Sequence, residues 1–394
     1  MYRRKLSLSS TRLIRTFNAV SVLQTLYKEG SCSRARLTEV TKMSQATIAR
    51  IVTELTDRGV IVEERVGESN GGRRPIIFRL NYEQLFTVGI QLLKERSSIV
   101  IGDIKGKILF KKVFHQTSLE PEKFIEELAR EFELLLEGSQ IDRENILGVG
   151  LAVSGIINRE LGLLHKSINL GWYEVKIVEL LEKTLGLPVF VENDANAGAL
   201  AEIWFGGAKN VSSLLYLKAF RGVGVGIVFE GKLLSGVKGM SGEIAHYPLV
   251  DNGKPCRCGQ HGCIESYLYM PDILQQYARE SGINLDDDNE LLVYAFDGEP
   301  LAEKYIEEIS EILAKTITFV TLLLDIDLII MGELWGKVGK QFAALITQKV
   351  EIMTKYSGLN KTILVKPSGL GVDSDLLGAI GLVIDEWFTP PIWC

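Results

Sequence analysis

The sequence lacks any apolar run long enough to cross a membrane. The stretch FVTLLLDIDLIIM at residues 319–331 is interrupted by Asp325 and Asp327, whereas a spanning helix needs about 20 mostly apolar residues. The first residues, MYRRKLSLSSTRLIR, carry charge but no apolar core of a secretory signal. These absences exclude a membrane-spanning protein, and we expect a cytoplasmic chain without a membrane partner.

Cysteine is scarce, yet three of the five cysteines fall within the segment CRCGQHGCIES, residues 256–266. In a reducing cytoplasm such spacing favours a metal site over a disulfide. Three thiolates and one imidazole would form a closed tetrahedral zinc site, which leaves no position for an activated water and is therefore structural. The predicted sulfur ligands are Cys256, Cys258 and Cys263, and the fourth ligand is either His246 or His261.

Acidic residues are few in the first part of the chain. Residues 1–80 hold 15 Lys and Arg against 7 Asp and Glu, a net charge of +8, while the remainder carries −14. At 394 residues, with 46% hydrophobic and 24% charged residues, the chain is long enough for two or three globular domains. The charge asymmetry indicates that the basic end binds a polyanion.

The basic end carries the pattern of a helix-turn-helix. Apolar residues at helical spacing between 13 and 27 predict a first helix that ends at Gly30, and Ser33 is suited to cap a second. Ser44 begins a third helix, which would bury its Ile, Val and Leu residues and expose polar side chains able to bond bases in the major groove. The predicted DNA contacts on this helix are Ser44, Gln45, Thr47 and Arg50.

A β-hairpin should follow the third helix. The segment VIVEERVGESNGGRRPIIFRL alternates with strand periodicity on both sides of a glycine-rich turn. Such a hairpin is the wing of a winged helix, and Arg73 and Arg74 at its tip are placed to meet phosphates or the minor groove. The alternative is an interaction module that binds no DNA.

The acidic remainder alternates strands and helices. Strand patterns recur from Phe86 to about residue 331, separated by helical segments, and the last helix is SDLLGAIGLVIDEW. This order predicts an α/β protein with two sheet-bearing lobes.

Three blocks in this region, VENDANAGALAE, GMSGEIAHYPL and CRCGQHGCIES, resemble signature blocks of the ROK family of bacterial sugar kinases and sugar-responsive repressors. The preceding winged helix matches the repressor branch. The resemblance implies a two-lobed domain of the actin and hexokinase type (ribonuclease H-like, ATPase-type) at 81–394, after a DNA-binding domain at 1–80. Lobe one would span about 81–195 plus a C-terminal helix at about 375–394, and lobe two about 196–374.

The same resemblance implies a sugar site. It favours His246 as the fourth zinc ligand, since family members use the His of the Glu-x-x-His block. In family members, further residues bond sugar hydroxyls, and the resemblance matches them to residues of this chain. Carboxylates suit such bonds because charge-assisted hydrogen bonds are strong. The implied sugar-side residues are Gly155, Asn169, Asn193, Asp194, Glu243, His246 and Glu265.

Kinase activity is not expected, although Asp194 matches the base of the family's kinases. The family's phosphate loops are rich in glycine, whereas this chain has Gln91 in place of a metal-binding Asp and Leu92, Leu93 and Lys94 in place of small residues. Phe220 and Arg221 replace a Gly-Thr pair, and Glu333 replaces a glycine. Phosphoryl transfer depends on such loops.

We therefore predict a non-catalytic, sugar-sensing transcriptional regulator, and the resemblance to the repressor branch implies that it is a repressor. It would bind operator DNA as a homodimer or higher oligomer, respond to a sugar or sugar phosphate, and need zinc but no ATP. The alternative is an ATP-dependent sugar kinase of the glucokinase or N-acetylglucosamine kinase type.

Overall fold

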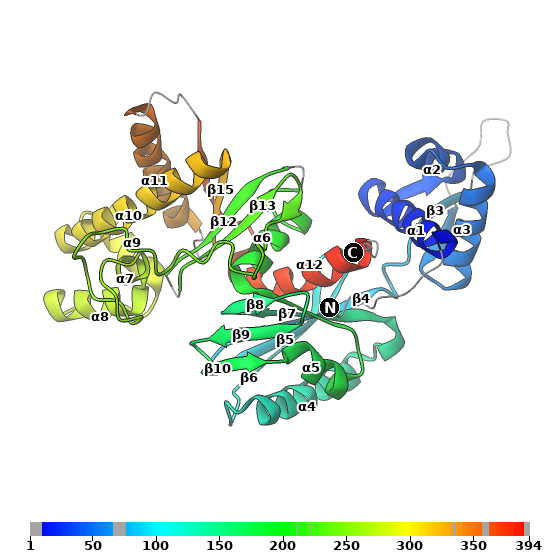
Figure 1. The fold of residues 1–394 in the computed structure, drawn as a ribbon, viewed down its shortest axis with the longest axis horizontal. Helices are drawn as coiled ribbons and strands as arrows, with labels where there is room; N and C mark the ends of the chain where they lie inside the picture. Colours follow the sequence, from blue (N-terminus) through cyan, green and yellow to red (C-terminus); the bar gives the residue numbers. More distant parts are fainter. Residues whose placement is uncertain are drawn as a thin grey trace.

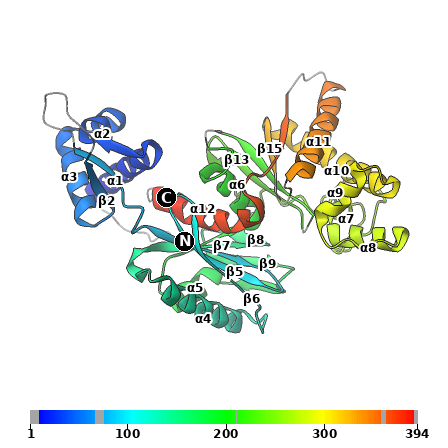
Figure 2. The same cartoon turned by 180° about the vertical axis from the view of Figure 1, so that it is seen from behind.

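The computed structural model describes residues 10–65, 76–209, 211–220, 222–332, 334, 336–356 and 362–389. The predicted wing-tip residues Arg73 and Arg74 lie outside this part of the chain, as do Arg221 and Glu333. A small N-terminal domain lies beside a larger region built on two five-stranded sheets (Figures 1 and 2). Within the described residues, no helix combines the length and the apolar character needed to cross a membrane.

In the described residues, the N-terminal domain has three helices and a three-stranded sheet in the order β1-β3-β2. Ser33 and Ser44 cap α2 and α3 by accepting hydrogen bonds from the backbone N–H groups of Arg36 and Thr47, and these caps determine where the two helices begin. The elements are α1 Ser10–Glu29, β1 Ser31–Ser33, α2 Arg34–Thr41, α3 Gln45–Asp57, β2 Ile61–Arg65 and β3 Ile76–Leu80. The predicted helix-turn-helix and hairpin strands are confirmed.

The first lobe is built on a five-stranded sheet in the order β11-β7-β4-β5-β6. The neighbours of β5 are antiparallel to it, while β4, β7 and β11 run parallel to one another. The strands are β4 Phe86–Leu92, β5 Ser97–Asp103, β6 Ile108–Phe114, β7 Ile146–Val153 and β11 Val189–Asn193.

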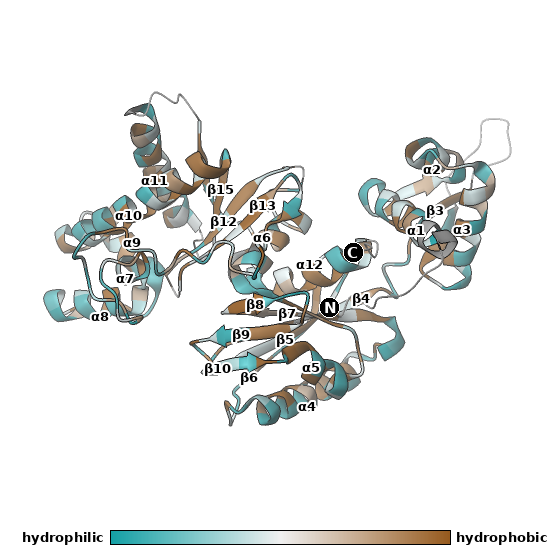
Figure 3. Ribbon diagram, in the orientation of Figure 1, coloured by the Kyte–Doolittle hydropathy of each residue, from teal (hydrophilic) through white to brown (hydrophobic). Residues whose placement is uncertain are grey.

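Apolar stripes on two helices cover this sheet. Phe124, Leu128 and Leu181 are fully buried in the resulting core. Figure 3 shows the apolar strands of the sheet beside helices whose outer faces are hydrophilic. The helices are α4 Pro121–Ser139 and α5 Ile177–Leu185, the short 3-10 helix η1 spans Arg143–Asn145, and an added sheet contains β8 Ile156–Asn158, β9 Leu163–Ser167 and β10 Trp172–Val175.

The second lobe repeats the plan of the first sheet. Its order is β14-β13-β12-β15-β16, with antiparallel pairing among the first three strands and parallel pairing from β12 through β15 to β16. The strands are β12 Leu214–Lys218, β13 Gly224–Phe229, β14 Lys232–Leu233, β15 Leu328–Met331 and β16 Leu364–Pro367. The helices are α7 Glu265–Leu268, α8 Met270–Ser281, α9 Asp288–Phe296, α10 Pro300–Leu324 and α11 Gly336–Tyr356, with the 3-10 helix η2 at Gly371–Asp373.

Two helices, α6 Asp194–Trp204 and α12 Ser374–Phe388, pack against each other between the lobes. Helix α12 covers β4 and β7 of the first sheet, and α6 covers β12 and β13 of the second. Glycine allows the close approach, because a Cβ atom on Gly378 would lie 2.3 Å from the carbonyl oxygen of Ala197. The two predicted sheet-bearing lobes are confirmed, and the last helix of the chain lies on the first sheet.

Candidate functional site

The helix predicted to read DNA presents its polar side to solvent. Ile48, Ile51 and Val52 of α3 are buried in the core of the N-terminal domain, whereas Gln45 and Arg50 are exposed. This division follows from the helical spacing of the apolar residues. The exposed face of α3 is therefore free to enter a major groove.

Two hydroxyl groups at the start of α3 are engaged within the protein. Ser44 Oγ accepts from the backbone N–H of Thr47 at 3.1 Å and lies 2.9 Å from Thr47 Oγ1.

A hollow of about 510 Å³ lies farther along the same face of α3, where three arginines and two carboxylates meet. Its lining is Arg15, Ala49, Arg50, Thr53, Glu54, Asp57 and Arg58.

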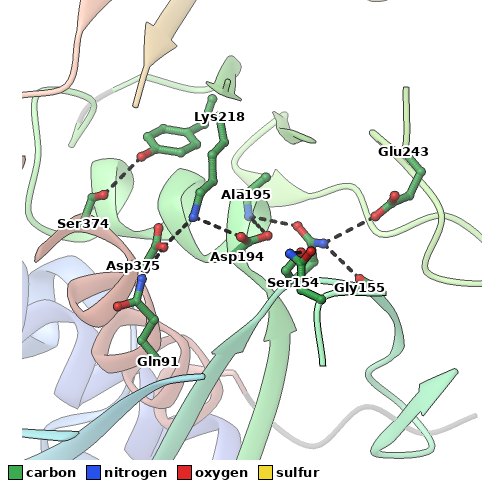
Figure 4. Close-up of polar contacts among 12 residues, drawn as sticks. Gln91, Ser154, Gly155, Asp194, Ala195, Lys218, Glu243, Ser374 and Asp375 are labelled. Carbon is green, nitrogen blue, oxygen red and sulfur yellow. Dashed lines mark hydrogen bonds and ion pairs between the residues drawn. The ribbon is translucent and has the colours of Figure 1, made fainter. Parts of the chain in front are cut away.

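A second group of predicted residues meets where β7 and β11 end side by side, since Val153 pairs with Asn193 in the parallel register. Gly155 has a φ of 144°, and a Cβ atom there would lie 2.3 Å from the carbonyl oxygen of Lys166, so only glycine fits. Asn193 Nδ2 donates to the carbonyl oxygen of Gly155 at 3.0 Å and to Glu243 Oε1 at 3.4 Å. Figure 4 shows dashed lines from this amide group to Gly155 and to Glu243.

Asp194, the first residue of α6, faces an ammonium group. Lys218 Nζ lies 2.9 Å from Asp194 Oδ2 and donates to Asp375 Oδ2 at 2.5 Å. Gln91 Nε2 donates to the same Asp375 oxygen at 2.6 Å. Lys218 and Asp375 are buried, and Figure 4 shows the four side chains converging from both lobes.

Glu243 lies on the loop after β14, close to two other carboxylates. Glu243 as a residue is exposed, but nearby protein atoms partly desolvate its carboxyl group. This desolvation, followed by the negative charges of Asp194 and Glu265, raises the pKa of Glu243 to about 7. A carboxyl group with this pKa can either accept or donate a hydrogen bond near neutral pH.

Asn169 lies on the exposed loop between β9 and β10, where its Nδ2 atom approaches Ser154 Oγ at 3.4 Å. Ser154 adjoins Gly155, so the structure brings Asn169 to the rim of the same polar group. A residue that accepts and donates at the rim suits a polyhydroxylated ligand.

The cysteine segment folds into a compact cluster with a histidine. Ligand atoms of His246, Cys256, Cys258 and Cys263 all lie within 4.8 Å of one another. His246 Nδ1 lies 3.6 Å from the Cys256 sulfur, and the Cys258 and Cys263 sulfurs are 3.7 Å apart. His261 is exposed and does not belong to this group. Between the two candidate histidines, the structure therefore places His246 with the sulfurs.

This cluster lies where the loop that carries Glu243 meets the start of α7, whose first residue is Glu265. The backbone N–H of Glu265 donates to the carbonyl oxygen of Ala245 at 2.9 Å, and that of Ile264 donates to Tyr247 at 3.1 Å. Glu265 Oε2 lies 3.6 Å from His246 Nδ1. A metal ion held by the cluster would fix both carboxylates relative to each other.

The thiols differ in how readily they lose a proton. The backbone N–H of Gln260 lowers the pKa of Cys258, whereas burial raises the pKa of Cys263 to about 12. Because thiolate is the form that binds metal, a bound cation would have to displace the Cys263 proton.

Sequence reasoning missed three residues of the polar group. Lys218 and Asp375 were not singled out, nor was Ser154, although a lysine that ends the apolar run LLYL is an available signal of a buried charge pair. Asp375 gives no comparable signal, because an acidic residue in the first turn of a helix is ordinary.

The sequence profile of the ROK family matches residues 87–386, and that of a winged helix-turn-helix DNA-binding domain matches residues 20–62. The putative xylose repressor of Caldicellulosiruptor sp. (strain Rt8B.4) is 28% identical over 96% of this chain and 98% of its own length. The N-acetylglucosamine repressor of Escherichia coli O6:H1 is 25% identical over 82% of each chain.

The fold also has a close counterpart among solved structures. The crystal structure of a ROK family transcriptional regulator, a homologue of the E. coli MLC protein, superposes with a TM-score of 0.84 at 24% identity and covers 95% of this chain and 97% of its own. The architecture is therefore a winged helix-turn-helix joined to an actin- and hexokinase-like domain. With most of its length matched by one family profile, the chain belongs to the ROK family.

Proposed function

We propose that this protein is a sugar-responsive transcriptional repressor that controls genes of carbohydrate uptake or catabolism. The observation that carries the proposal is the presence in one chain of an exposed polar face on α3 and the Gly155, Asn193 and Glu243 hydrogen-bonding group. The names of the xylose and N-acetylglucosamine repressors support the same function.

For DNA, we propose that α3 enters the major groove and that the wing contacts the backbone. Gln45 and Arg50 would read bases, because their side chains are exposed and can bond bidentately. Ser44 and Thr47 would act near the phosphates, since both hydroxyls already hold the start of the helix. For Arg73 and Arg74, contact with phosphates or the minor groove stays a prediction from the sequence.

For the sugar, we propose that hydroxyl groups bond to Asn193, Asp194 and Glu243, with Asn169 at the rim. Glu265 at the start of α7 and His246 on the adjoining loop would complete the site. Each carboxylate accepts from a hydroxyl, and Glu243 when protonated can also donate. A monosaccharide or its phosphate is the ligand class that this donor and acceptor set fits.

For the metal, we propose zinc, held by His246, Cys256, Cys258 and Cys263. Three soft thiolates and one imidazole in a compact group are typical ligands of Zn²⁺. Ca²⁺ and Mg²⁺ prefer oxygen ligands instead. With four protein ligands the ion would supply stability and not chemistry.

We propose that the protein does not phosphorylate its sugar. The Lys218 ammonium lies beside Asp194, and Gln91 is bonded to Asp375, so both side chains are engaged within the protein. Phe220, with a φ of 84°, directs its buried ring toward Phe342 at a centroid distance of 6.2 Å, where family kinases carry a glycine. The second candidate, an ATP-dependent sugar kinase, is favoured only by the retained Asp194.

We further propose a cytoplasmic homodimer on a pseudo-palindromic operator, because two winged helices one or more helical turns apart match such a site. The division of the chain at residues 80 and 81, with lobes at 81–195 and 196–374 and the last helix returned to the first lobe, stays a prediction.

Calorimetric titration of the full chain tests the sugar assignment. The panel is D-xylose, D-glucose, N-acetyl-D-glucosamine and the 6-phosphates of the two hexoses. The proposal expects a saturable isotherm with one site per chain for at least one member, and a flat response to all of them would reject the sugar site.

A further inference from the structure

Helices α6 and α12 both begin at the sugar-side polar group and both end at the DNA-binding domain. Asp194 is the first residue of α6, and Asp375 lies in the first turn of α12. Trp204 and Phe388 are the last residues of the same two helices. With 11 and 15 residues, the helices extend about 16 and 22 Å.

One residue joins the two helices at each end. At the sugar side, the Lys218 ammonium reaches both Asp194 Oδ2, at 2.9 Å, and Asp375 Oδ2, at 2.5 Å. Lys218 ends β12, so this contact also fixes the second sheet to the helix pair.

At the other end, the Tyr27 ring of α1 contacts Trp204 and Phe388, with centroid distances of 5.5 and 5.1 Å. The Trp204 and Phe388 rings stack on each other at 5.7 Å. Gln24 Nε2 donates to the Phe388 carbonyl oxygen at 2.9 Å. The first helix of the DNA-binding domain is therefore seated on the ends of both helices.

Between these ends the helices are packed too closely to slide past each other freely. A Cβ atom on Gly378 would meet the backbone of Ala197, and one on Gly381 would lie 3.3 Å from the Trp204 ring. Packed helices of this kind move as a unit, because a close-packed contact has few alternative arrangements.

We propose that α6 and α12 form one connector, positioned by Lys218 at the sugar site and read out through Tyr27 by the DNA-binding domain. The inference rests on the proposed function and adds its route of regulation. A sugar hydroxyl that bonds Asp194 competes with Lys218 for the same carboxylate. Lys218 then holds α6 and α12 in a different balance, and the two helices shift together. The shift moves α1, because the rings of Trp204 and Phe388 contact the ring of Tyr27.

Such a route predicts that coupling can be lost while binding is kept. Coupling is the ratio of the DNA dissociation constants with and without sugar, and a ligand changes that ratio only through its differential affinity for two states. A residue that merely stabilises the fold would change both dissociation constants and leave their ratio intact.

The test uses full-length protein, a fluorescent duplex selected by the protein from a random library, and the sugar panel named above. Tyr27→Leu removes the ring, whereas Tyr27→Phe is the matched control that loses only the hydroxyl bond to the Ile104 carbonyl. In the wild type and Tyr27→Phe we expect sugar to change DNA affinity by about 5- to 150-fold. In Tyr27→Leu we expect the ratio to approach 1, while the DNA affinity measured without sugar and the sugar affinity measured without DNA each stay within about 3-fold of wild type.

A second pair of variants tests the other end. Lys218→Met should likewise bring the ratio toward 1, whereas Lys349→Met, which breaks the distant ion pair with Glu307, should leave it unchanged. Full coupling in both Tyr27→Leu and Lys218→Met would overturn the connector and leave the proposed function standing. A wild-type protein whose DNA affinity responds to no sugar would instead reject the proposed function itself.

Discussion

Lys218 Nζ lies 2.9 Å from Asp194 Oδ2, so an ammonium group from the second lobe neutralises the carboxylate that begins α6. In this arrangement Asp194 can still accept a hydrogen bond from a sugar, but it already shares its charge with the protein. The same ammonium holds Asp375, and through it Gln91 of the first lobe. A single buried cation thus links the groups around which a sugar would bind.

The first prediction concerns catalysis. With Lys218 beside Asp194 and Phe220 in the turn after β12, we expect no steady phosphorylation of the sugar panel in a coupled assay with Mg-ATP. Loss of one transition-state donor already lowers a rate by about 10²–10³, and several are changed here. A family glucokinase run in parallel is the positive control. Sustained turnover that depends on Asp194 would favour the kinase alternative.

The second prediction concerns DNA. Arg50→Ala should weaken binding to the selected duplex by about 1–3 kcal/mol, the value of one good base contact, because Arg50 is exposed on α3. Sugar binding should be unchanged. The matched control is Arg130→Ala, which removes an exposed arginine from α4. Equal DNA affinity of the Arg50 variant and wild type in fluorescence anisotropy would refute the assignment of α3.

The third prediction concerns pH. The pKa of Glu243 is raised to about 7, so the folded protein holds this proton more tightly than the unfolded chain does. The stability from this group is therefore present at low pH and is lost as pH rises toward 7. Glu243→Gln cannot lose it, so its melting temperature relative to wild type should rise between about pH 4.5 and 7 and then level off.

Thermal denaturation at several pH values measures this difference. Glu137→Gln, at an exposed position on α4, serves as the control and should follow the wild type at every pH. A constant offset between Glu243→Gln and wild type would show that Glu243 titrates in the folded protein as it does in the unfolded chain.

The fourth prediction concerns the metal. Purified protein should contain one zinc per chain, and Cys256→Ser should lose it together with at least about 1 kcal/mol of stability and part of the sugar affinity. The expected cause is that the metal cluster holds the loop of Glu243 next to the start of α7, where Glu265 lies. Cys32→Ala is the control, since Cys32 is buried in the N-terminal domain and outside the cluster. Metal analysis that finds no zinc in wild type would discard the structural-zinc account.

The fifth prediction concerns the connector's packing. Gly378→Ala should destabilise the protein by about 1–3 kcal/mol, because the new Cβ atom would lie 2.3 Å from the Ala197 carbonyl oxygen. Gly138→Ala in α4 is the control: its Cβ atom meets nothing within 4 Å, and we expect about 0.5–1 kcal/mol of stabilisation. Equal stability of the two variants in urea denaturation would mean that α12 has room to move away from α6.

Much of the fold could be predicted from local signals. Serine caps indicated where α2 and α3 begin, and apolar segments indicated the strands of both five-stranded sheets except β16, which was not predicted. The segment GVGIVFEGKLL at 224–234 has the pattern of one continuous strand, but the structure divides it into β13 and β14 because Glu230 and Gly231 turn with positive φ angles. Helices α5, α6 and α11 were not predicted, and in α6 the small residues of DANAGALAE hide the usual apolar stripe.

The site was predictable in part for a different reason. Cysteines that lie close together in the sequence, such as Cys256, Cys258 and Cys263, predict a metal site by their spacing alone. The link from Lys218 to Asp375 joins residues 157 positions apart and depends on how the two sheets face the helices between them. Tyr27 is similar, because an aromatic residue on the stripe of α1 looks like an ordinary core residue until its partners Trp204 and Phe388 are known.

The central claim is that one chain binds DNA and a sugar and that each affects the other. The most direct measurement is fluorescence anisotropy of the full-length protein on its selected duplex, with and without each sugar of the panel. The account predicts that at least one sugar weakens DNA binding by about 5- to 150-fold. DNA affinity that stays the same with every sugar, including one that calorimetry shows to be bound, would contradict it.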